Sequence, residues 1–208
     1  AYDKVLVVGS DALSRWVDWE DRGVCILFGD GAGAVVVEGA AEGAASGLLG
    51  WAMHSDGKGR CDLSCEGTRS ARPLAETGIV VAEESAYGPI AMNGNKVYVF
   101  ATKRVPEVIL EALDHAGLGV DDVDWLLLHQ ANVRIMEAAA KRLGIPMDKV
   151  LVSLDECGNT SAGSIPIALD DAIGQGKVQQ GDVVACAGFG AGLSWGAAIF
   201  KWAGPQAH

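Results

Sequence analysis

The sequence lacks long hydrophobic runs, low-complexity segments and an excess of basic charge. Its apolar runs, such as residues 5–8 and 34–37, fall far short of the roughly 20 residues that a membrane-spanning helix needs. The first residues show no secretory leader pattern. A formal charge of −11 disfavours nucleic-acid binding, which depends on neutralising phosphates. We therefore expect a globular cytoplasmic protein that binds neither membranes nor nucleic acid.

Cysteine is present, but its pattern suits neither a disulfide framework nor a zinc site. The five cysteines are odd in number, and most lie in strand-like or glycine-rich surroundings, which favours free thiols in a reducing compartment. Cys61 and Cys65 could supply two zinc ligands. A tetrahedral site needs about four ligands, and no second Cys or His pair at ligand spacing follows. We expect no metal and no cofactor.

Strand and helix patterns alternate along the chain. Half of the residues are apolar, which is enough for a substantial core. Helical apolar stripes occur at 105–116, where Pro106 allows a break or a start, and at 136–143, and a glycine closes each one. Another helix is expected to start at 159–161. Strands are predicted at 4–9, 24–28, 48–53, 78–82, 124–128, 149–154, 182–187 and 196–200. This alternation favours an α/β fold with a mostly parallel sheet.

Two glycine turns that feed apolar strands indicate an internal duplication. The turn at 28–31 precedes the strand 33–37, and the turn at 189–192 precedes the strand 196–200. Glycine-rich hairpins also recur by chance, which explains the similarity of the turns alone equally well. Because both copies end similar strand and helix runs, we interpret them as parts of two related halves. Residues 1–41 would end an incomplete first half, and residues 42–208 would form the second.

Two polar residues follow two predicted strands at their carboxyl ends. His129 comes directly after the strand that ends at Leu128, and Asn159 follows the strand at 149–154. Open α/β sheets place their ligand sites at such ends, so the two side chains could converge. The alternative is a loop histidine and an asparagine that only caps a helix.

The residues around these two positions carry a resemblance that covers nearly the whole chain. It is weakest from Gly57 to Ala86. The motifs, in order, are Asp21-Arg22, Leu27-Phe28-Gly29-Asp30-Gly31-Ala32-Gly33-Ala34, Met92-Asn93-Gly94, His129-Gln130-Ala131-Asn132 with Arg134, Gly158-Asn159-Thr160-Ser161-Ala162, and Gly188-Phe189-Gly190-Ala191-Gly192 with Ser194-Trp195-Gly196. Together they resemble the C-terminal portion of the β-ketoacyl-acyl carrier protein synthase III family. The resemblance implies a thiolase-like fold of two related halves in αβαβα layers, with the first half incomplete here.

The resemblance also implies an acyltransferase that starts fatty acid synthesis. The family condenses an acyl-CoA primer, acetyl-CoA, with malonyl-acyl carrier protein, and releases CoA and CO2. By resemblance, His129 and Asn159 donate hydrogen bonds to the malonyl thioester oxygen as the enolate forms. The turn with Gly190 and Ala191 would supply a second oxyanion donor, and Phe189 would border the acyl pocket. The family's nucleophilic cysteine matches no cysteine here, since Cys157 lies within a tight turn, so we expect this chain alone to be inactive.

Substrate binding is expected on basic and amide side chains. Arg134 and Lys141, with Arg142 beside them, share the outward face of one predicted helix, although an ordinary solvated face would look similar. The resemblance assigns Arg22 to the coenzyme's nucleotide end, and Asn95, Asn132 and Arg134 to the pantetheine channel or carrier site. Val99 stands where family members often carry Lys or Arg, so one basic contact differs.

The expected partners are acyl-CoA, acyl carrier protein and a second copy of the chain in a homodimer. Two rival functions share these features. One is a related polyketide starter synthase, which would use the same His and Asn. The other is a partner chain that binds acyl carrier protein without catalysis.

Overall fold

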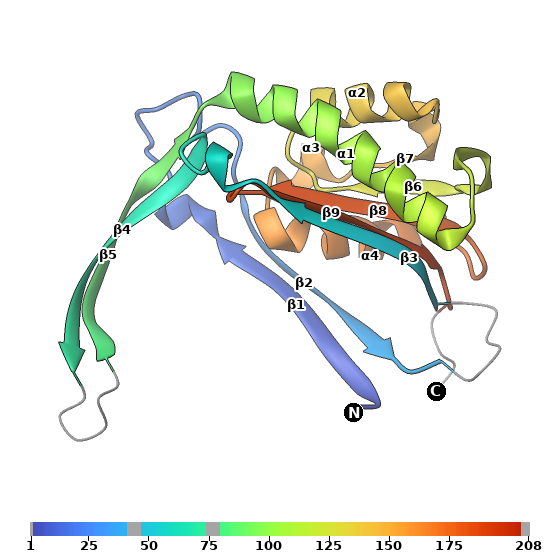
Figure 1. Ribbon diagram of the computed structural model, residues 1–208, viewed down its shortest axis with the longest axis horizontal. Helices are drawn as coiled ribbons and strands as arrows, with labels where there is room; N and C mark the ends of the chain where they lie inside the picture. Colours follow the sequence, from blue (N-terminus) through green and yellow to red (C-terminus); the bar gives the residue numbers. More distant parts are fainter. Residues whose placement is uncertain (1, 41–46, 74–79, 205–208) are drawn as a thin grey trace.

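A mixed five-stranded sheet forms the centre of the computed structural model, which describes residues 2–40, 47–73 and 80–204 (Figure 1). Its strands, in spatial order, are β3 (Gly47–Ser55), β9 (Ser194–Lys201), β8 (Val183–Gly190), β6 (Trp125–Leu128) and β7 (Val150–Leu151). β6 is parallel to β7 and β8, whereas β9 is antiparallel to β8 and β3. The expectation of a mostly parallel sheet is therefore wrong. The turn between β8 and β9 has three residues, and so short a turn can only join antiparallel strands.

Helices cover both faces of this sheet (Figure 1). Successive side chains of β6 point to opposite faces. Leu126 and Leu128 accordingly join one core, with α1 (Gly94–Ala116) and α2 (Val133–Leu143). Leu127 joins the other, with α4 (Ser164–Gly174). The continuous apolar run of β6 is thus explained by burial on both sides.

A two-stranded ribbon lies beyond α4. It pairs β1 (Lys4–Ala12) with β2 (Asp30–Glu38), and Val35 of β2 packs on the α4 core. The layers therefore run helix, sheet, helix, sheet, as the expected layered α/β fold requires. The predicted boundary between residues 41 and 42 lies outside the described residues and stays a prediction. A second ribbon, β4 (Leu63–Pro73) with β5 (Val80–Met92), projects from the body (Figure 1).

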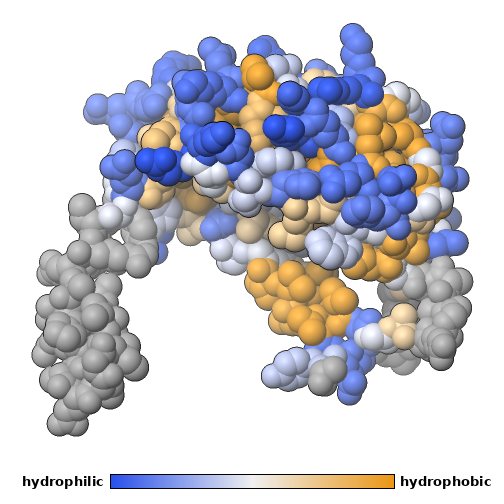
Figure 2. All heavy atoms as spheres, in the orientation of Figure 1, coloured by the Kyte–Doolittle hydropathy of each residue, from blue (hydrophilic) through white to orange (hydrophobic). Residues whose placement is uncertain are grey.

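Apolar and polar surfaces are separated on the molecule. Figure 2 shows hydrophilic side chains over the α1 face and a cluster of hydrophobic ones over the β1–β2 ribbon. The exposed apolar residues of this ribbon are Val5, Leu6, Val7, Val8, Val36 and Val37. No helix in the described part of the chain is long and apolar enough to cross a membrane.

Helix ends follow the capping residues in the sequence. Asn93 and Asn132 cap α1 and α2 by accepting backbone N–H groups, and Gly117 and Gly144 end these helices with left-handed φ of 67° and 78°. α1 continues through Pro106, so this residue neither starts nor breaks it. The shorter elements are η1 (Leu13–Arg15), η2 (Gly57–Gly59), η3 (Val120–Asp122), η4 (Met147–Lys149), α3 (Leu154–Cys157) and η5 (Ser161–Gly163).

Three expected elements differ from the structure. The segment 24–27 forms consecutive turns instead of a strand, because the N–H groups of Val24 and Cys25 both donate to Asp21 O, and Phe28 makes an isolated parallel bridge with Asn159. The strand expected at 149–154 is limited to β7, because the Ser153 N–H donates to the side-chain oxygen of Gln130 instead of a strand. The helix expected from 159–161 begins only at Ser164, after the η5 turn.

Gln130 ties together the ends of the two strands that precede the candidate site residues. This side chain is fully buried. Its Nε2 donates to Leu128 O at 2.6 Å and to Leu151 O at 3.2 Å, and its Oε1 accepts the Ser153 N–H at 3.0 Å. One buried amide thus supplies hydrogen-bond partners to backbone groups at the ends of β6 and β7.

Replacing Gln130 with leucine should destabilise the fold strongly. Gln130→Leu leaves two carbonyls and one N–H buried without partners, and each such group costs about 1–3 kcal/mol. We expect the free energy of unfolding in urea to fall by at least about 2 kcal/mol. Gln179→Leu, at an exposed glutamine, is the matched control and should change stability by about 0.5 kcal/mol or less. Equal effects of the two substitutions would contradict the role given to Gln130.

Candidate active site

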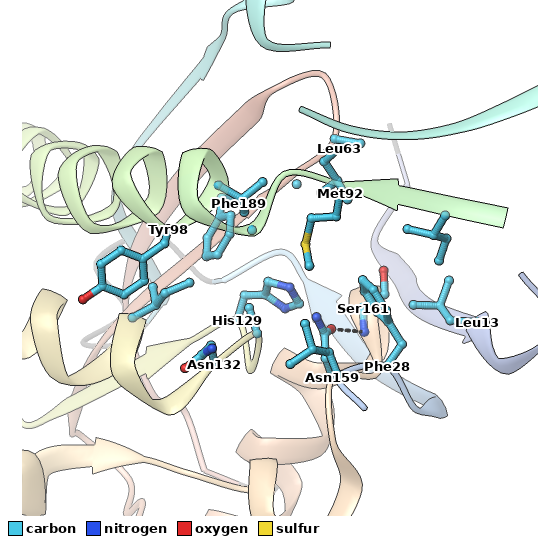
Figure 3. Close-up of a pocket in the computed structure, with 18 of the residues that line it drawn as sticks. Leu13, Phe28, Leu63, Met92, Tyr98, His129, Asn132, Asn159, Ser161 and Phe189 are labelled. Carbon is cyan, nitrogen blue, oxygen red and sulfur yellow. Dashed lines mark hydrogen bonds between the residues drawn. The ribbon is translucent and has the colours of Figure 1, made fainter. Parts of the chain in front are cut away.

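A pocket of about 960 Å³ opens where the ends of β6 and β8 meet the starts of α1 and α2 (Figure 3). Eight residues singled out from the sequence line it: His129, Asn159, Phe189, Gly190, Ala191, Asn95, Asn132 and Arg134. They come from segments up to about a hundred residues apart in sequence. The predicted convergence of two strand ends is therefore observed.

His129 is held by its backbone and by one ring nitrogen. Its N–H donates to Ala187 O at 2.8 Å, which continues the pairing of β6 with β8. Its Nδ1 lies 2.7 Å from Ser164 Oγ, at the start of α4. The ring packs against Phe189 in a T-shaped arrangement, with 5.4 Å between ring centroids. Nε2 is left to face the pocket (Figure 3).

Burial lowers the pKa of His129 to about 4, because the charged imidazolium loses hydration among apolar neighbours. The ring is therefore neutral at physiological pH and can donate from one nitrogen only. In the unfolded chain the histidine binds a proton near pH 6.5, so acid favours unfolding as the pH falls from that value toward 4.

Asn159 is oriented by its own loop. The residue is 6% exposed, and its Oδ1 accepts the Ser161 N–H at 2.9 Å (Figure 3). This contact fixes the amide, so that Nδ2 is the free donor. Among the described residues, no hydrogen-bond partner occupies this nitrogen. Asn159 is therefore not the N-cap of the long helix α4. Its side chain stabilises the η5 turn, which precedes that helix.

The Asn159 loop is also held by the first part of the chain. Asn159 N donates to Leu27 O at 3.0 Å, and Gly29 N donates to Asn159 O at 2.8 Å. A side chain at Gly29 would meet Cys157 O at 2.5 Å, so only glycine allows this close approach. The glycine turn noticed in the sequence thus brings the two halves together at the site.

The β8–β9 turn supplies a further donor. Phe189 and Gly190 end β8, and Ala191 begins the turn, facing the pocket. In the described residues the Ala191 N–H has no hydrogen-bond acceptor. Its position at the pocket wall suits the oxyanion role that the resemblance implies, and Phe189 borders the same space.

The pocket has an apolar wall that sequence reasoning did not identify. Its members are Leu13, Trp16, Leu27, Phe28, Leu63, Ile90, Met92, Val97, Tyr98 and Ile135. They lie in turns, in the base of the β4–β5 ribbon and at helix starts, where no periodic pattern distinguishes pocket residues from core residues. Only Leu27, Phe28 and Met92 stood within recognised motifs.

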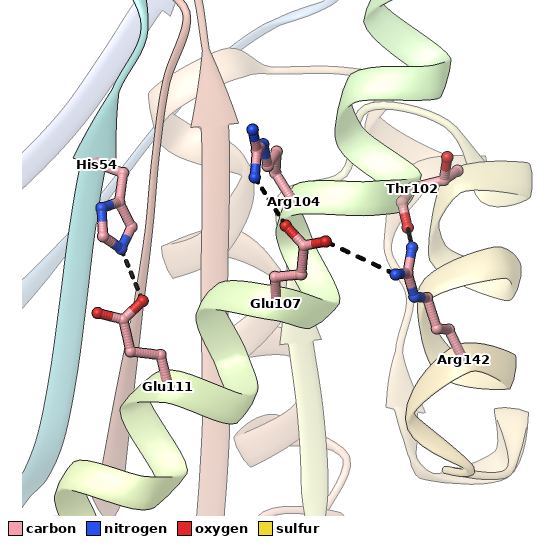
Figure 4. Close-up of polar contacts among 6 residues, drawn as sticks. All are labelled: His54, Thr102, Arg104, Glu107, Glu111 and Arg142. Atoms are coloured by element: carbon pink, nitrogen blue, oxygen red, sulfur yellow. Dashed lines mark hydrogen bonds and ion pairs between the residues drawn. The ribbon is translucent and has the colours of Figure 1, made fainter.

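A second pocket of about 540 Å³ adjoins the first, and His129 and Phe189 line both. Ser161, Gly190 and Trp195 also line it. The Trp195 ring packs against His54, 5.5 Å between centroids, and His54 Nε2 lies 2.7 Å from Glu111 of α1 (Figure 4).

The predicted basic residues lie in different settings. Arg134 is exposed at the mouth of the larger pocket, and Lys141 is exposed on the same helix. Arg142 instead contacts α1, where it pairs with Glu107 at 3.6 Å and donates to Thr102 O at 3.4 Å (Figure 4). Arg22 is exposed and does not line the pocket, although its neighbour Gly23 does.

All five cysteines are free thiols in the structure. Cys157 lines neither pocket. Burial raises the pKa of Cys186 to about 12, so this thiol is inert. Cys65 lines the larger pocket, which the sequence did not indicate, and its Sγ donates to Gly88 O at 3.2 Å as a protonated thiol.

The chain matches two family models. Residues 1–57 match the family described as 3-oxoacyl-[acyl-carrier-protein (ACP)] synthase III, and residues 113–202 match its C-terminal model. Curated relatives include β-ketoacyl-[acyl-carrier-protein] synthase III of Acaryochloris marina and of Microcystis aeruginosa. Each is 54% identical over 97% of this chain. The chain spans 59% of the length of both relatives.

Solved structures agree with these matches. The synthase III structures from Aquifex aeolicus and Thermus thermophilus are each 40% identical to the chain, with TM-scores of 0.83 and 0.84. They cover 96% and 98% of this chain, which covers 58% and 60% of theirs. The thiolase-like fold is thereby confirmed. Since both family models describe the same family and together match more than half of the residues, the chain belongs to the 3-oxoacyl-[acyl-carrier-protein] synthase III family.

Proposed function

We propose that this chain provides the decarboxylation and condensation residues of a β-ketoacyl-acyl carrier protein synthase III. The reaction joins an acyl-CoA primer, acetyl-CoA, to malonyl-acyl carrier protein and yields a 3-oxoacyl-carrier protein, CoA and CO2. One observation carries the proposal. His129 and Asn159 each line the same pocket and each have one side-chain nitrogen without a hydrogen-bond partner among the described residues.

The geometry suits the charge that this reaction develops. When the malonyl carboxylate leaves as CO2, its electron pair moves onto the thioester and places negative charge on the oxygen as an enolate. Two neutral, preorganised donors in an apolar pocket stabilise that oxygen at little cost in reorganisation. The enolate carbon then attacks the acyl thioester carbonyl, and the thiolate of the acylated cysteine leaves.

A separate donor serves the acyl group. The attack forms a tetrahedral intermediate whose oxyanion needs its own hydrogen bonds, and the free Ala191 N–H is suited to that role. By resemblance, the nucleophilic cysteine of the family matches no cysteine of this chain, Cys157 included. The location of Cys157 outside both pockets supports this assignment.

The α2 face is proposed as the carrier-protein surface of a homodimeric cytoplasmic enzyme. Arg134 lies at the pocket mouth, and Lys141 is exposed farther along α2. Acyl carrier protein is acidic, and the phosphopantetheine that it bears must reach the pocket, so local positive charge would steer it despite the net charge of −11.

A related function remains as the second candidate. The chain is 33% identical, with a TM-score of 0.78, to a priming β-ketosynthase from the R1128 polyketide pathway. Such an enzyme would use the same donors with a different primer. Turnover of a panel of acyl-CoA primers with malonyl-carrier protein from fatty acid synthesis separates the two candidates.

Removing the Asn159 donor should separate the two half-reactions. Asn159→Asp retains an oxygen for the Ser161 N–H but replaces the free donor with an acceptor. In the active enzyme that contains this chain, CO2 release from malonyl-carrier protein should fall by about 10²–10³. Acyl-enzyme formation should fall less, because that step uses the backbone oxyanion donor. Rapid-quench measurement of both steps tests this.

Two variants control this experiment. Asn159→Ala removes both the donor and the loop contact, and His129→Ala removes the second donor. Each should slow decarboxylation by at least the same order. Circular dichroism and urea unfolding check that the variants fold. Unchanged decarboxylation in Asn159→Asp, or an equal loss in acylation, would contradict the assigned role.

Charge reversal on α2 should weaken use of the carrier protein. Arg134→Glu with Lys141→Glu should raise the KM for malonyl-carrier protein several-fold at low salt and less at 0.5 M salt, because exposed charges are screened. Lys177→Glu, an exposed lysine outside α2, is the matched control and should have little effect. A KM that the double variant leaves unchanged at both ionic strengths would assign this face to ordinary solvation.

A further inference from the structure

The contacts of His129 raise the question of which ring nitrogen carries its proton. A neutral imidazole has one N–H, and the partner of one nitrogen decides whether the other can donate. Here Nδ1 has a partner in Ser164 Oγ at 2.7 Å, and Nε2 faces the pocket. The direction of the hydrogen bond between Ser164 and Nδ1 therefore determines what His129 offers to a ligand.

A second contact of the serine favours one direction of this hydrogen bond. The backbone N–H of Gln130 donates to Ser164 Oγ at 3.3 Å, so the oxygen already acts as an acceptor there. The serine is 1% exposed, so bulk water does not reach its hydroxyl group as an alternative acceptor. Among the described residues, Nδ1 is the only acceptor within reach of its hydroxyl proton.

The opposite arrangement would leave a buried donor unsatisfied. If Nδ1 carried the proton, Ser164 Oγ would accept from both His129 and Gln130, and its hydroxyl hydrogen would have no acceptor in the described structure. A buried polar hydrogen without a partner is unfavourable. The chain avoids this when the serine donates to Nδ1.

We propose that Ser164 is a positioning residue that holds neutral His129 as the Nε2–H tautomer, and so aims a donor into the pocket. With the other tautomer, Nε2 would present a lone pair to the enolate oxygen and repel it. The catalytic consequence rests on the proposed function, whereas the tautomer itself does not.

Nitrogen NMR tests the tautomer directly. In protein labelled with ¹⁵N-histidine at pH 8, the His129 resonances are assigned by their loss in His129→Phe. We expect Nε2 at the position typical of a protonated ring nitrogen and Nδ1 at that of an unprotonated, hydrogen-bonded one. A wild-type spectrum with the proton on Nδ1 overturns the proposal, whatever the variants do.

Variants test the cause. Ser164→Ala should give averaged shifts from a mixture of both tautomers, and Ser164→Thr, which keeps the hydroxyl, should restore the Nε2–H form. Ser153→Ala is the matched control, since Ser153 is buried at 4% exposure and its hydroxyl does not contact His129. Unchanged His129 shifts in a folded Ser164→Ala protein would contradict the role of the serine.

Activity separates this proposal from the proposed function. In the active enzyme, Ser164→Ala should lower the kcat for decarboxylation by about tenfold or more with little change in KM, and Ser164→Thr should recover it. A mixed tautomer with full decarboxylation would overturn the catalytic part. If His129→Ala also left decarboxylation intact, the proposed function would fail while the tautomer assignment stood.

Discussion

The site depends on the hydrogen bonds that hold the carboxyl ends of β6 and β7 together. These strand ends are buried, so water does not satisfy their backbone groups. Where a parallel sheet ends, its last carbonyls and N–H groups lose their ladder partners. Gln130 satisfies three of these groups with one buried amide, so the chain can turn sharply on both sides of it. His129 directly follows β6, and Asn159 lies in the loop that follows β7 and α3. Their side chains reach a common pocket because Gln130 fixes the segments that follow the two strands.

Burial then determines how the two donors act. The low pKa of His129 keeps the ring uncharged, and the Asn159 amide is uncharged at any pH. In the proposed reaction, the developing oxyanion would meet two neutral dipoles whose positions are set in advance by Ser164 and Ser161. In a pocket lined mainly by apolar side chains, such dipoles interact more strongly than they would in water.

Sequence patterns predicted the parts of the fold that obey a period or a cap. The α1 and α2 stripes, the glycines that end them and the strands β6, β8 and β9 were all expected. The strand predicted at 24–28 was wrong because Asp21 O captures the following N–H groups, which is tertiary detail with no period. Motif resemblance identified His129 and Asn159, but Ser164 and the apolar pocket wall depend on distances between segments far apart in sequence. No local pattern contains those distances.

The central claim is that His129 and Asn159 hold one thioester oxygen between them. A crystal structure of the active enzyme with a malonyl thioester analogue that cannot lose CO2 tests this most directly. We predict that the thioester oxygen lies about 2.7–3.1 Å from both His129 Nε2 and Asn159 Nδ2. The account would be contradicted by an analogue whose thioester oxygen contacts neither nitrogen and is held instead by other groups of the pocket.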